Sequence, residues 1–261
     1  MRSFKIFGIA LMFAFSSIAL VSCSDDDDNV VDNQPTVIKR LSSMTVNKVY
    51  STGPITIAMT DFVYDKDGRL LSYMKDGEKI SYEYASNAIT ISSNNGRGGI
   101  SQDTYTIKDG NIIDYTDGYY NFKYSYSGNK LVNYKSPWDE IYTFDWSNGL
   151  KSLSFKSSIQ NEDISYNYST SKCLNQIIFY DVDNLPFYDC EIDPFLAEQG
   201  YYGDTFIINL PDSYTLKHSD GRTWGRNFKY QLDSDGYVTS MTAEGFGDST
   251  GKVETYSFTW E

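Results

Sequence analysis

Most of this chain alternates, residue by residue, between aromatic or aliphatic side chains and small hydrophilic ones. Side chains alternate across a β-strand, so each such stretch has one face to bury and one face to expose to water. The clearest examples are Phe122–Tyr126, Tyr142–Trp146, Ile164–Tyr168, Phe228–Leu232 and Tyr256–Trp260. The pattern predicts antiparallel strands and an all-β fold.

Glycine-containing turns stand between the predicted strands, at 65–68, 108–110, 147–149 and 233–236. Glycine supplies the positive φ that tight hairpin turns need. Beyond the turns, an apolar residue is followed by another three positions later, as in Leu70/Tyr73, Ile112/Tyr115, Leu131/Tyr134, Leu150/Leu153, Leu174/Ile177 and Val238/Met241. These pairs recur at one, two or three units of about 21 residues, which indicates a repeated hairpin.

A spacing of three places the two residues of a pair on opposite faces of a regular strand. Either both faces are covered near the turn, or a β-bulge brings the pair to one side. We favour the bulge, because a glycine turn followed by a bulge is common in hairpins. Repeated bulges curl a sheet, so we expect antiparallel hairpin repeats in one large curled sheet or a closed or nearly closed barrel. A single β-rich domain would span 38–261.

One segment departs from the β pattern. Asp193 can cap a helix, Pro194 suits a first helical position, and Phe195–Glu198 could form one or two turns before Gly200. We therefore expect a short helical insertion near 193–200, and it could plug one end of the sheet.

The first residues form a targeting segment rather than part of the fold. The apolar run Ile6–Leu20 is shorter than the roughly 20 residues of a membrane-spanning helix. The tetrapeptide Leu20–Cys23 resembles the lipobox of bacterial lipoproteins. Residues 1–22 are then a signal peptide, and Cys23 becomes the lipidated first residue, held to the bilayer by its acyl chains.

An acidic tether follows the cysteine. Residues 23–37 are predicted to be a linker: Ser24 and the run Asp25–Asp28 follow Cys23, and the rest of the segment shows no β pattern. A short acidic run at this position resembles the signal that sends lipoproteins of Bacteroidota-type bacteria through the outer membrane. We therefore expect an outer-membrane lipoprotein exposed at the cell surface.

The mature chain is strongly acidic. Removal of Arg2 and Lys5 leaves 20 of the 22 basic residues against 35 acidic ones, a net charge of −15. Such a surface repels phosphate backbones, so nucleic acid is not an expected partner. The expected partners are the lipid bilayer, through acylated Cys23, and a glycan or an envelope protein.

The segment Tyr64–Leu70 resembles the tyrosine–aspartate hairpin repeats of bacterial surface proteins. Together with the lipobox, the acidic tether, Ile192–Phe195 and Asn209–Pro211, it resembles a Bacteroidota surface lipoprotein family. This resemblance implies a porin-like β domain of unknown function and supplies no catalytic residues. However, tyrosine occurs throughout the apolar face and the opposite face is strongly polar, unlike a lipid-facing strand surface. We therefore expect the aromatic face to turn inward.

Few residues are candidates for a disulfide, a catalytic site or a metal site. Cys173 and Cys190 could form a disulfide in an exported protein, or be two small buried residues. His218 is the single histidine, and the segment Lys217–Gly221 is predicted to be a solvated turn. A Ser–His–Asp site is therefore not expected. The scarcity of His and Cys also argues against a His- or Cys-based zinc site. Alternate aspartates at 65/67 and 233/235 read as turn residues rather than calcium ligands. No cofactor or metal is expected.

Two functions remain open. Trp138, in a loop between strands, and Tyr201 and Tyr202, beside the helical insertion, are candidate ligand contacts. They favour a non-enzymatic binding or structural module. The alternative is a carboxylate-based glycan hydrolase, for which two carboxyl groups must face one another across a cleft. The acidic residues that could form such a pair are Asp139, Glu140, Glu162, Asp163, Asp189, Glu191 and Asp193.

Overall fold

The computed structural model of the chain describes residues 39–50, 53–94, 98–146, 150–158, 161–172, 190–203 and 209–261. The compact unit that contains them spans Lys39–Glu261. The signal peptide, Cys23 and the linker at 23–37 lie outside the described residues. So do Cys173, Asp189, the pair Leu174/Ile177 and the turn at 147–149.

Sixteen described strands and one short helix build this unit. The first eight strands are β1 (Leu41–Tyr50), β2 (Gly53–Tyr64), β3 (Leu70–Lys75), β4 (Glu78–Tyr84), β5 (Ala88–Asn94), β6 (Ile100–Lys108), β7 (Asn111–Thr116) and β8 (Asn121–Ser127). The others are β9 (Lys130–Lys135), β10 (Ile141–Trp146), β11 (Leu150–Lys156), β12 (Asn161–Lys172), β13 (Asn209–His218), β14 (Thr223–Leu232), β15 (Val238–Gly247) and β16 (Val253–Trp260). Helix α2 (Pro194–Glu198) lies in the connection between β12 and β13.

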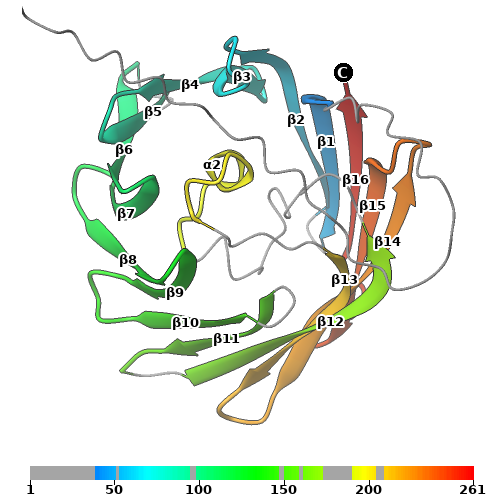
Figure 1. Cartoon of the computed structure of the whole chain (residues 1–261). Helices are drawn as coiled ribbons and strands as arrows, with labels where there is room; N and C mark the ends of the chain where they lie inside the picture. The colour runs from blue at the N-terminus through cyan, green and yellow to red at the C-terminus, as the bar shows by residue number, and fades with distance from the viewer. Residues whose placement is uncertain are drawn as a thin grey trace, which may run out of the picture. The chain divides into compact units, whose positions relative to one another are not determined.

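The strands form a closed antiparallel barrel in which each strand pairs with its neighbours in the sequence. The barrel closes where β1 pairs with β16, in a register that sets Met44 opposite Phe258. Figure 1 shows β1 and β16 side by side at this seam. The expected all-β fold of antiparallel hairpins is confirmed, and the sheet closes fully.

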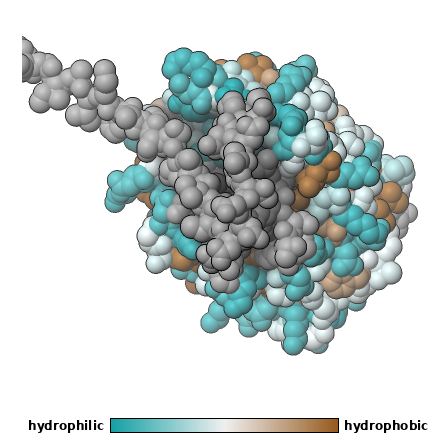
Figure 2. Space-filling view, turned by 45° about the vertical axis from the view of Figure 1, so that its right-hand side comes forward, coloured by the Kyte–Doolittle hydropathy of each residue, from teal (hydrophilic) through white to brown (hydrophobic). Residues whose placement is uncertain are grey.

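The aromatic face of the sheet points inward. Tyr124, Phe144, Tyr166 and Phe258 lie in the core and are at most 6% exposed. The alternate residues of the same strands face outward and are polar, as in Asn121, Lys123, Ser125, Thr255, Ser257 and Thr259. Figure 2 accordingly shows hydrophobic residues scattered over the described surface, among hydrophilic ones. A lipid-facing barrel surface has the reverse polarity.

The expected bulges are present. Tyr64 on β2 pairs with Leu70 on β3, whereas Val63 pairs with Ser72, so Leu71 is the extra residue. The same shift in register occurs beside Ile112, Leu131, Leu150 and Val238. Each bulge turns both residues of an apolar pair into the core, where Leu70 is fully buried and Tyr73 is 8% exposed. The seam between β1 and β16 has a similar shift, between Leu41 and Ser43.

Helix α2 lies inside the ring of strands (Figure 1). Asp193 caps it by accepting a 2.8 Å hydrogen bond from the Leu196 backbone N–H, and Pro194 is its first residue. Phe195 packs against three inward-facing rings of the barrel wall, those of Phe62, Tyr73 and Tyr82. The predicted insertion is thus a plug held by the barrel wall. Within the described part of the chain, no helix has the length and apolar character needed to cross a membrane.

Candidate functional site

Consecutive hairpin turns lie at opposite ends of the barrel, so each end carries its own set of turns. We call one end the pocket end; it carries the turns at 117–120, 136–140, 219–222 and 248–252. We call the other the bulge end, because the bulges after the turns at 65–69, 109–110, 128–129 and 233–237 lie there. Two features at the pocket end, a pocket and an exposed aromatic cluster, are candidates for function.

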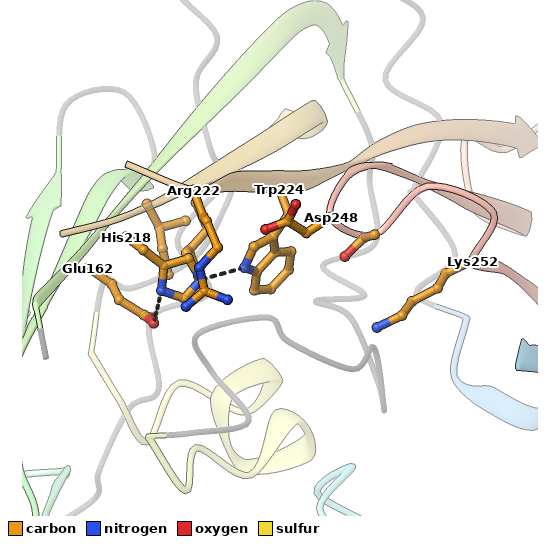
Figure 3. Close-up of a pocket in the computed structure, with 9 residues that line it drawn as sticks. Glu162, His218, Arg222, Trp224, Asp248 and Lys252 are labelled. Atoms are coloured by element: carbon orange, nitrogen blue, oxygen red, sulfur yellow. Dashed lines mark hydrogen bonds and ion pairs between the residues drawn. The ribbon is translucent and has the colours of Figure 1, made fainter. Parts of the chain in front are cut away.

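The pocket lies between the ends of β12, β13 and β14 and the β15–β16 turn, and has a volume of about 370 Å³ (Figure 3). Apolar side chains and both signs of charge line it: Glu162, Ile164, Leu216, His218, Arg222, Trp224, Asp248, Ser249 and Lys252. The inward-facing residues of three neighbouring strands supply its wall, because Glu162 pairs with His218 and Leu216 pairs with Trp224 across the ladders.

His218 is held from both sides of its ring. Its Nδ1 lies 2.7 Å from Oε1 of Glu162, and the indole N–H of Trp224 donates to its Nε2 over 2.8 Å. Because Nε2 accepts a hydrogen bond, the neutral imidazole carries its proton on Nδ1 and donates it to the carboxylate. The side chains of His218 and Glu162 are each only 15% exposed. The expectation of a solvated turn histidine was therefore wrong, since His218 ends a strand and faces inward.

The residues next to His218 do not join it. Ser219 and Asp220 are exposed in the turn, and Asp220 accepts hydrogen bonds from both the backbone N–H and the guanidinium of Arg222. These bonds lower the pKa of Asp220, and the carboxylate raises the pKa of Arg222. Asp220 thus serves to fold the turn that places Arg222 at the pocket.

The second feature is the Trp138 cluster, which we define as Tyr119, Tyr120 and Trp138. Their exposed fractions are 89%, 44% and 57%, which is high for aromatic side chains. The rings of Tyr120 and Trp138 contact each other with their centroids 4.9 Å apart. Trp138 also meets the buried Phe122 edge-on at 6.0 Å, which anchors the cluster to the core.

Short polar side chains fix the two turns that carry this cluster. Oδ1 of Asp117 accepts hydrogen bonds from the backbone N–H groups of Tyr119 and Tyr120, at 2.8 and 2.7 Å. In the neighbouring turn, Ser136 accepts from the Trp138 N–H and donates to Glu140. The rings are thus presented on ordered turns, which lowers the entropic cost of contacting a ligand.

Tyr201 and Tyr202 lie in the α2 connection, apart from the Trp138 cluster. Tyr202 is fully buried and meets Tyr124 edge-on at 5.3 Å. Tyr201 is half-buried and stacks on Tyr84 at 6.2 Å. Of the three aromatic residues singled out from the sequence, Trp138 therefore offers the largest accessible ring surface.

Asp193, half-buried at the start of α2, is the acidic candidate whose pKa is raised most clearly among the described residues. Burial raises its pKa to about 6, although hydrogen bonds from the backbone N–H of Leu196 and the hydroxyl of Tyr82 act in the opposite direction. The Tyr82 bond measures 2.9 Å and ties β4 to the cap of α2. The role that these contacts support is anchoring of the plug.

Two further acidic candidates, Asp139 and Glu140, serve local structure. Asp139 forms an ion pair with Lys135, and Glu140 accepts from Ser136. In the turns, Asp65 and Asp233 accept backbone N–H groups two and four residues later, as expected for turn residues. No group of three or more His, Cys, Asp or Glu side chains in the described ranges could hold a metal ion. Cys190 is buried, and its suggested partner Cys173 is outside these ranges.

Comparisons with known proteins support the fold. No protein-family model matches the sequence, and no curated protein does either. Among solved structures, a porin-like protein from Bacteroides uniformis ATCC 8492 is similar, with a TM-score of 0.59 and 18% identity over 85% of this chain and 98% of that one. A porin-like protein from Bacteroides vulgatus ATCC 8482 gives a TM-score of 0.52 and 18% identity over 85% and 99%. These likenesses confirm the expected porin-like fold.

Proposed function

We propose that this protein is a non-enzymatic binding module, anchored by lipid at the outer surface of a Bacteroidota-type outer membrane, whose Trp138 cluster contacts a glycan. The observation that carries the proposal is the exposure of three aromatic rings on two ordered turns of one barrel end. Exposed aromatic groups of this kind are costly to leave in water and mark contact surfaces. The flat faces of sugar rings pack well on aromatic faces, and hydroxyl groups can bond to the polar turn residues.

Lipid anchoring agrees with the polarity of the barrel. The outward faces of β8 and β16 carry Lys, Ser, Thr and Asn, unlike the apolar outward face of a strand embedded in lipid. We propose that acylated Cys23 supplies the attachment instead. The Cys23→Ala variant should then leave the membrane fraction for the aqueous fraction, whereas an embedded barrel would remain with the membrane.

Binding is tested with a glycan array probed with the purified protein, followed by titration of any glycan retained. Trp138→Ala should weaken binding by about tenfold or more, because a central aromatic contact commonly dominates an interface. Tyr120→Ala should have a smaller effect in the same direction. Ile100→Ala is the matched control, since Ile100 is 69% exposed on β6 and outside the cluster. Equal binding by all variants would contradict the proposal.

The hydrolase alternative has one observation in its favour, because Glu162 and Asp248 line the same pocket. However, Oε1 of Glu162 is engaged by His218, which leaves that carboxylate poorly placed to transfer a proton to a substrate. The assay is release of reducing ends from the glycans that the array identifies. Turnover by the native protein that disappears in both Glu162→Gln and Asp248→Asn would establish the alternative.

A further inference from the structure

A layer of buried polar side chains lies in the barrel wall near the pocket end. Lys48, Arg226 and Glu254 face inward and are 3%, 0% and 2% exposed. Lys48 and Glu254 are directly opposite one another across the seam between β1 and β16. One N–H of Arg226, on Nη2, lies 3.3 Å from Oε1 of Glu254, and the hydroxyl of Tyr256 donates to Oε2 over 2.7 Å. The carboxylate of Glu254 thus accepts hydrogen bonds from Arg226 and Tyr256, with Lys48 opposite it in the ladder.

The guanidinium of Arg226 is only partly satisfied. Its Nε and Nη1 atoms are buried and have no hydrogen-bond acceptor in the described part of the chain. A buried donor without an acceptor lowers the stability of the folded protein, and the loss is larger when the group is charged. Such unsatisfied groups are therefore rare in native proteins. A guanidinium matches the geometry of carboxylate, sulfate and phosphate oxygens.

This guanidinium lies one layer below the pocket. Trp224 lines the pocket, and Arg226 follows two residues later on the same inward face of β14. Nη1 of Arg226 would lie only 2.7 Å from a Cβ on Gly245, and the backbone oxygen of Ser249 would overlap that Cβ. The absence of a side chain at Gly245 therefore leaves room for the guanidinium. Ser249, which also contacts Gly245, lines the pocket.

We propose that the pocket leads to a buried oxyanion site at Arg226. A small organic anion would place a carboxylate, sulfate or phosphate group on the free guanidinium N–H groups. The rest of the molecule would lie in the pocket against Trp224 and the apolar floor of Ile164 and Leu216. Lys252 would meet it at the mouth, where its Nζ makes no ion pair with any described residue (Figure 3). This site is separate from the Trp138 cluster and does not depend on it.

The test is a titration of the full mature protein with sodium glucuronate, sodium phosphate and sodium sulfate, with neutral glucose as a control. Ionic strength is held constant, and concentrations stay below about 10 mM, where general stabilisation by excluded salts is small. A bound anion should raise the melting temperature in a saturable way. Glucuronate alone would identify an acidic sugar, whereas a response to phosphate and sulfate as well would identify a general oxyanion site. Glucose should have no effect.

The variants are chosen so that folding and binding can be separated. Arg226→Met combined with Glu254→Gln removes one positive and one negative buried charge together, so the net charge of the buried layer is unchanged and Lys48 remains in it. This double variant should fold, as judged by circular dichroism and cooperative melting, and lose the anion response. Lys252→Gln should weaken the response by several-fold. Lys217→Gln, on the outward face of β13, should leave the response unchanged.

Two results of the titrations would overturn the proposal. The first is a native protein whose melting temperature does not respond to any of the three anions. The second is a response that is the same in native protein and in a folded double variant, because the anion then binds elsewhere. If the double variant does not fold, a crystal of the native protein soaked in selenate decides: an anomalous peak is expected at Arg226, and ordered water there in place of selenate would overturn the proposal.

Discussion

The hydroxyl of Tyr64, the last residue of β2, donates a 2.8 Å hydrogen bond to the backbone carbonyl oxygen of Leu41, the first residue of β1. The same relationship recurs around the bulge end, where an aromatic side chain near the end of one strand bonds a carbonyl at the start of the preceding strand. The other copies are Tyr84–Leu70, Tyr126–Ile112, Trp146–Leu131, Tyr230–Pro211 and Trp260–Val238, at 2.5–2.9 Å. Bulges interrupt the ladder near these carbonyls, so the aromatic donors supply partners that the backbone lacks.

Removal of one such donor should therefore destabilise the barrel. Tyr126→Phe deletes the hydroxyl that bonds the Ile112 carbonyl at 2.6 Å while keeping the half-buried ring. The expected loss is about 1 kcal/mol in the free energy of unfolding, measured by urea denaturation. Tyr119→Phe is the control, because Tyr119 is 89% exposed and should cost close to nothing. Equal stabilities of the two variants would show that the carbonyl needs no partner.

The raised pKa of Asp193 predicts a definite dependence of stability on pH. The folded protein holds this proton up to about pH 6, whereas the unfolded chain releases it near the ordinary value of 3.8. The folded state therefore binds more protons between these values, and this contribution to stability is lost as pH rises from about 4 to 6. The total is on the order of 3 kcal/mol, at 1.36 kcal/mol for each pH unit.

Asp193→Asn isolates this effect. The amide oxygen can accept from the Leu196 N–H at the position of Oδ1, and the amide N–H group can donate to the Tyr82 hydroxyl oxygen at the position of Oδ2, but the side chain cannot ionise. The variant should match the native protein near pH 4 and exceed its melting temperature at pH 7, with the difference growing between the two. Comparison with the native protein at each pH cancels the titration of the other acidic groups. A variant that is less stable at pH 7 than the native protein would contradict the raised pKa.

Short-range sequence signals, namely residue alternation, turn glycines and a helix cap, were enough to predict the fold in considerable detail. The spacing of Leu70 and Tyr73 after a glycine turn predicted a bulge, because only an extra residue lets both side chains face the core. The cap at Asp193 followed from the same kind of local signal. Closure was harder, since the pairing of Leu41 with Trp260 joins the two ends of the domain and depends on the accumulated twist and shear of all the strands.

The pocket was missed for a similar reason. Glu162 and His218 face one another because β12 and β13 pair across a long connection, and no short-range pattern fixes that register. A partial signal did exist for the buried layer. Arg226 precedes Phe228 by two residues, and Glu254 precedes Tyr256 by two, so alternation alone places both charges on the inward face. Inward-facing positions near a strand end can also lie beyond the core, in contact with solvent. The alternation alone therefore did not show that these two charges are buried.

Two glycines of the β15–β16 hairpin region should respond differently to replacement by alanine. Gly245→Ala places a Cβ against the Ser249 carbonyl and the Arg226 guanidinium, so we expect a loss of about 2 kcal/mol or more. At Gly251 there is open space, but φ is +86°, so Gly251→Ala should cost about 1 kcal/mol through backbone strain alone. Urea denaturation distinguishes the two costs. A milder effect at Gly245 than at Gly251 would mean that the guanidinium does not occupy the space beside Gly245.

His218 offers a direct test of the pocket geometry, because it is the single histidine in the chain and its imidazole nitrogens give unambiguous NMR signals. At a pH where the ring is neutral, long-range ¹H–¹⁵N spectra should show a proton on Nδ1 and none on Nε2, since the Trp224 N–H occupies the Nε2 lone pair. Trp224→Phe removes that donor and should allow the tautomer with the proton on Nε2 to appear. Glu162→Gln keeps an acceptor for Nδ1–H, so it should preserve the native tautomer. A proton on Nε2 in the native protein would be incompatible with the Trp224 contact and with the pocket that it shapes.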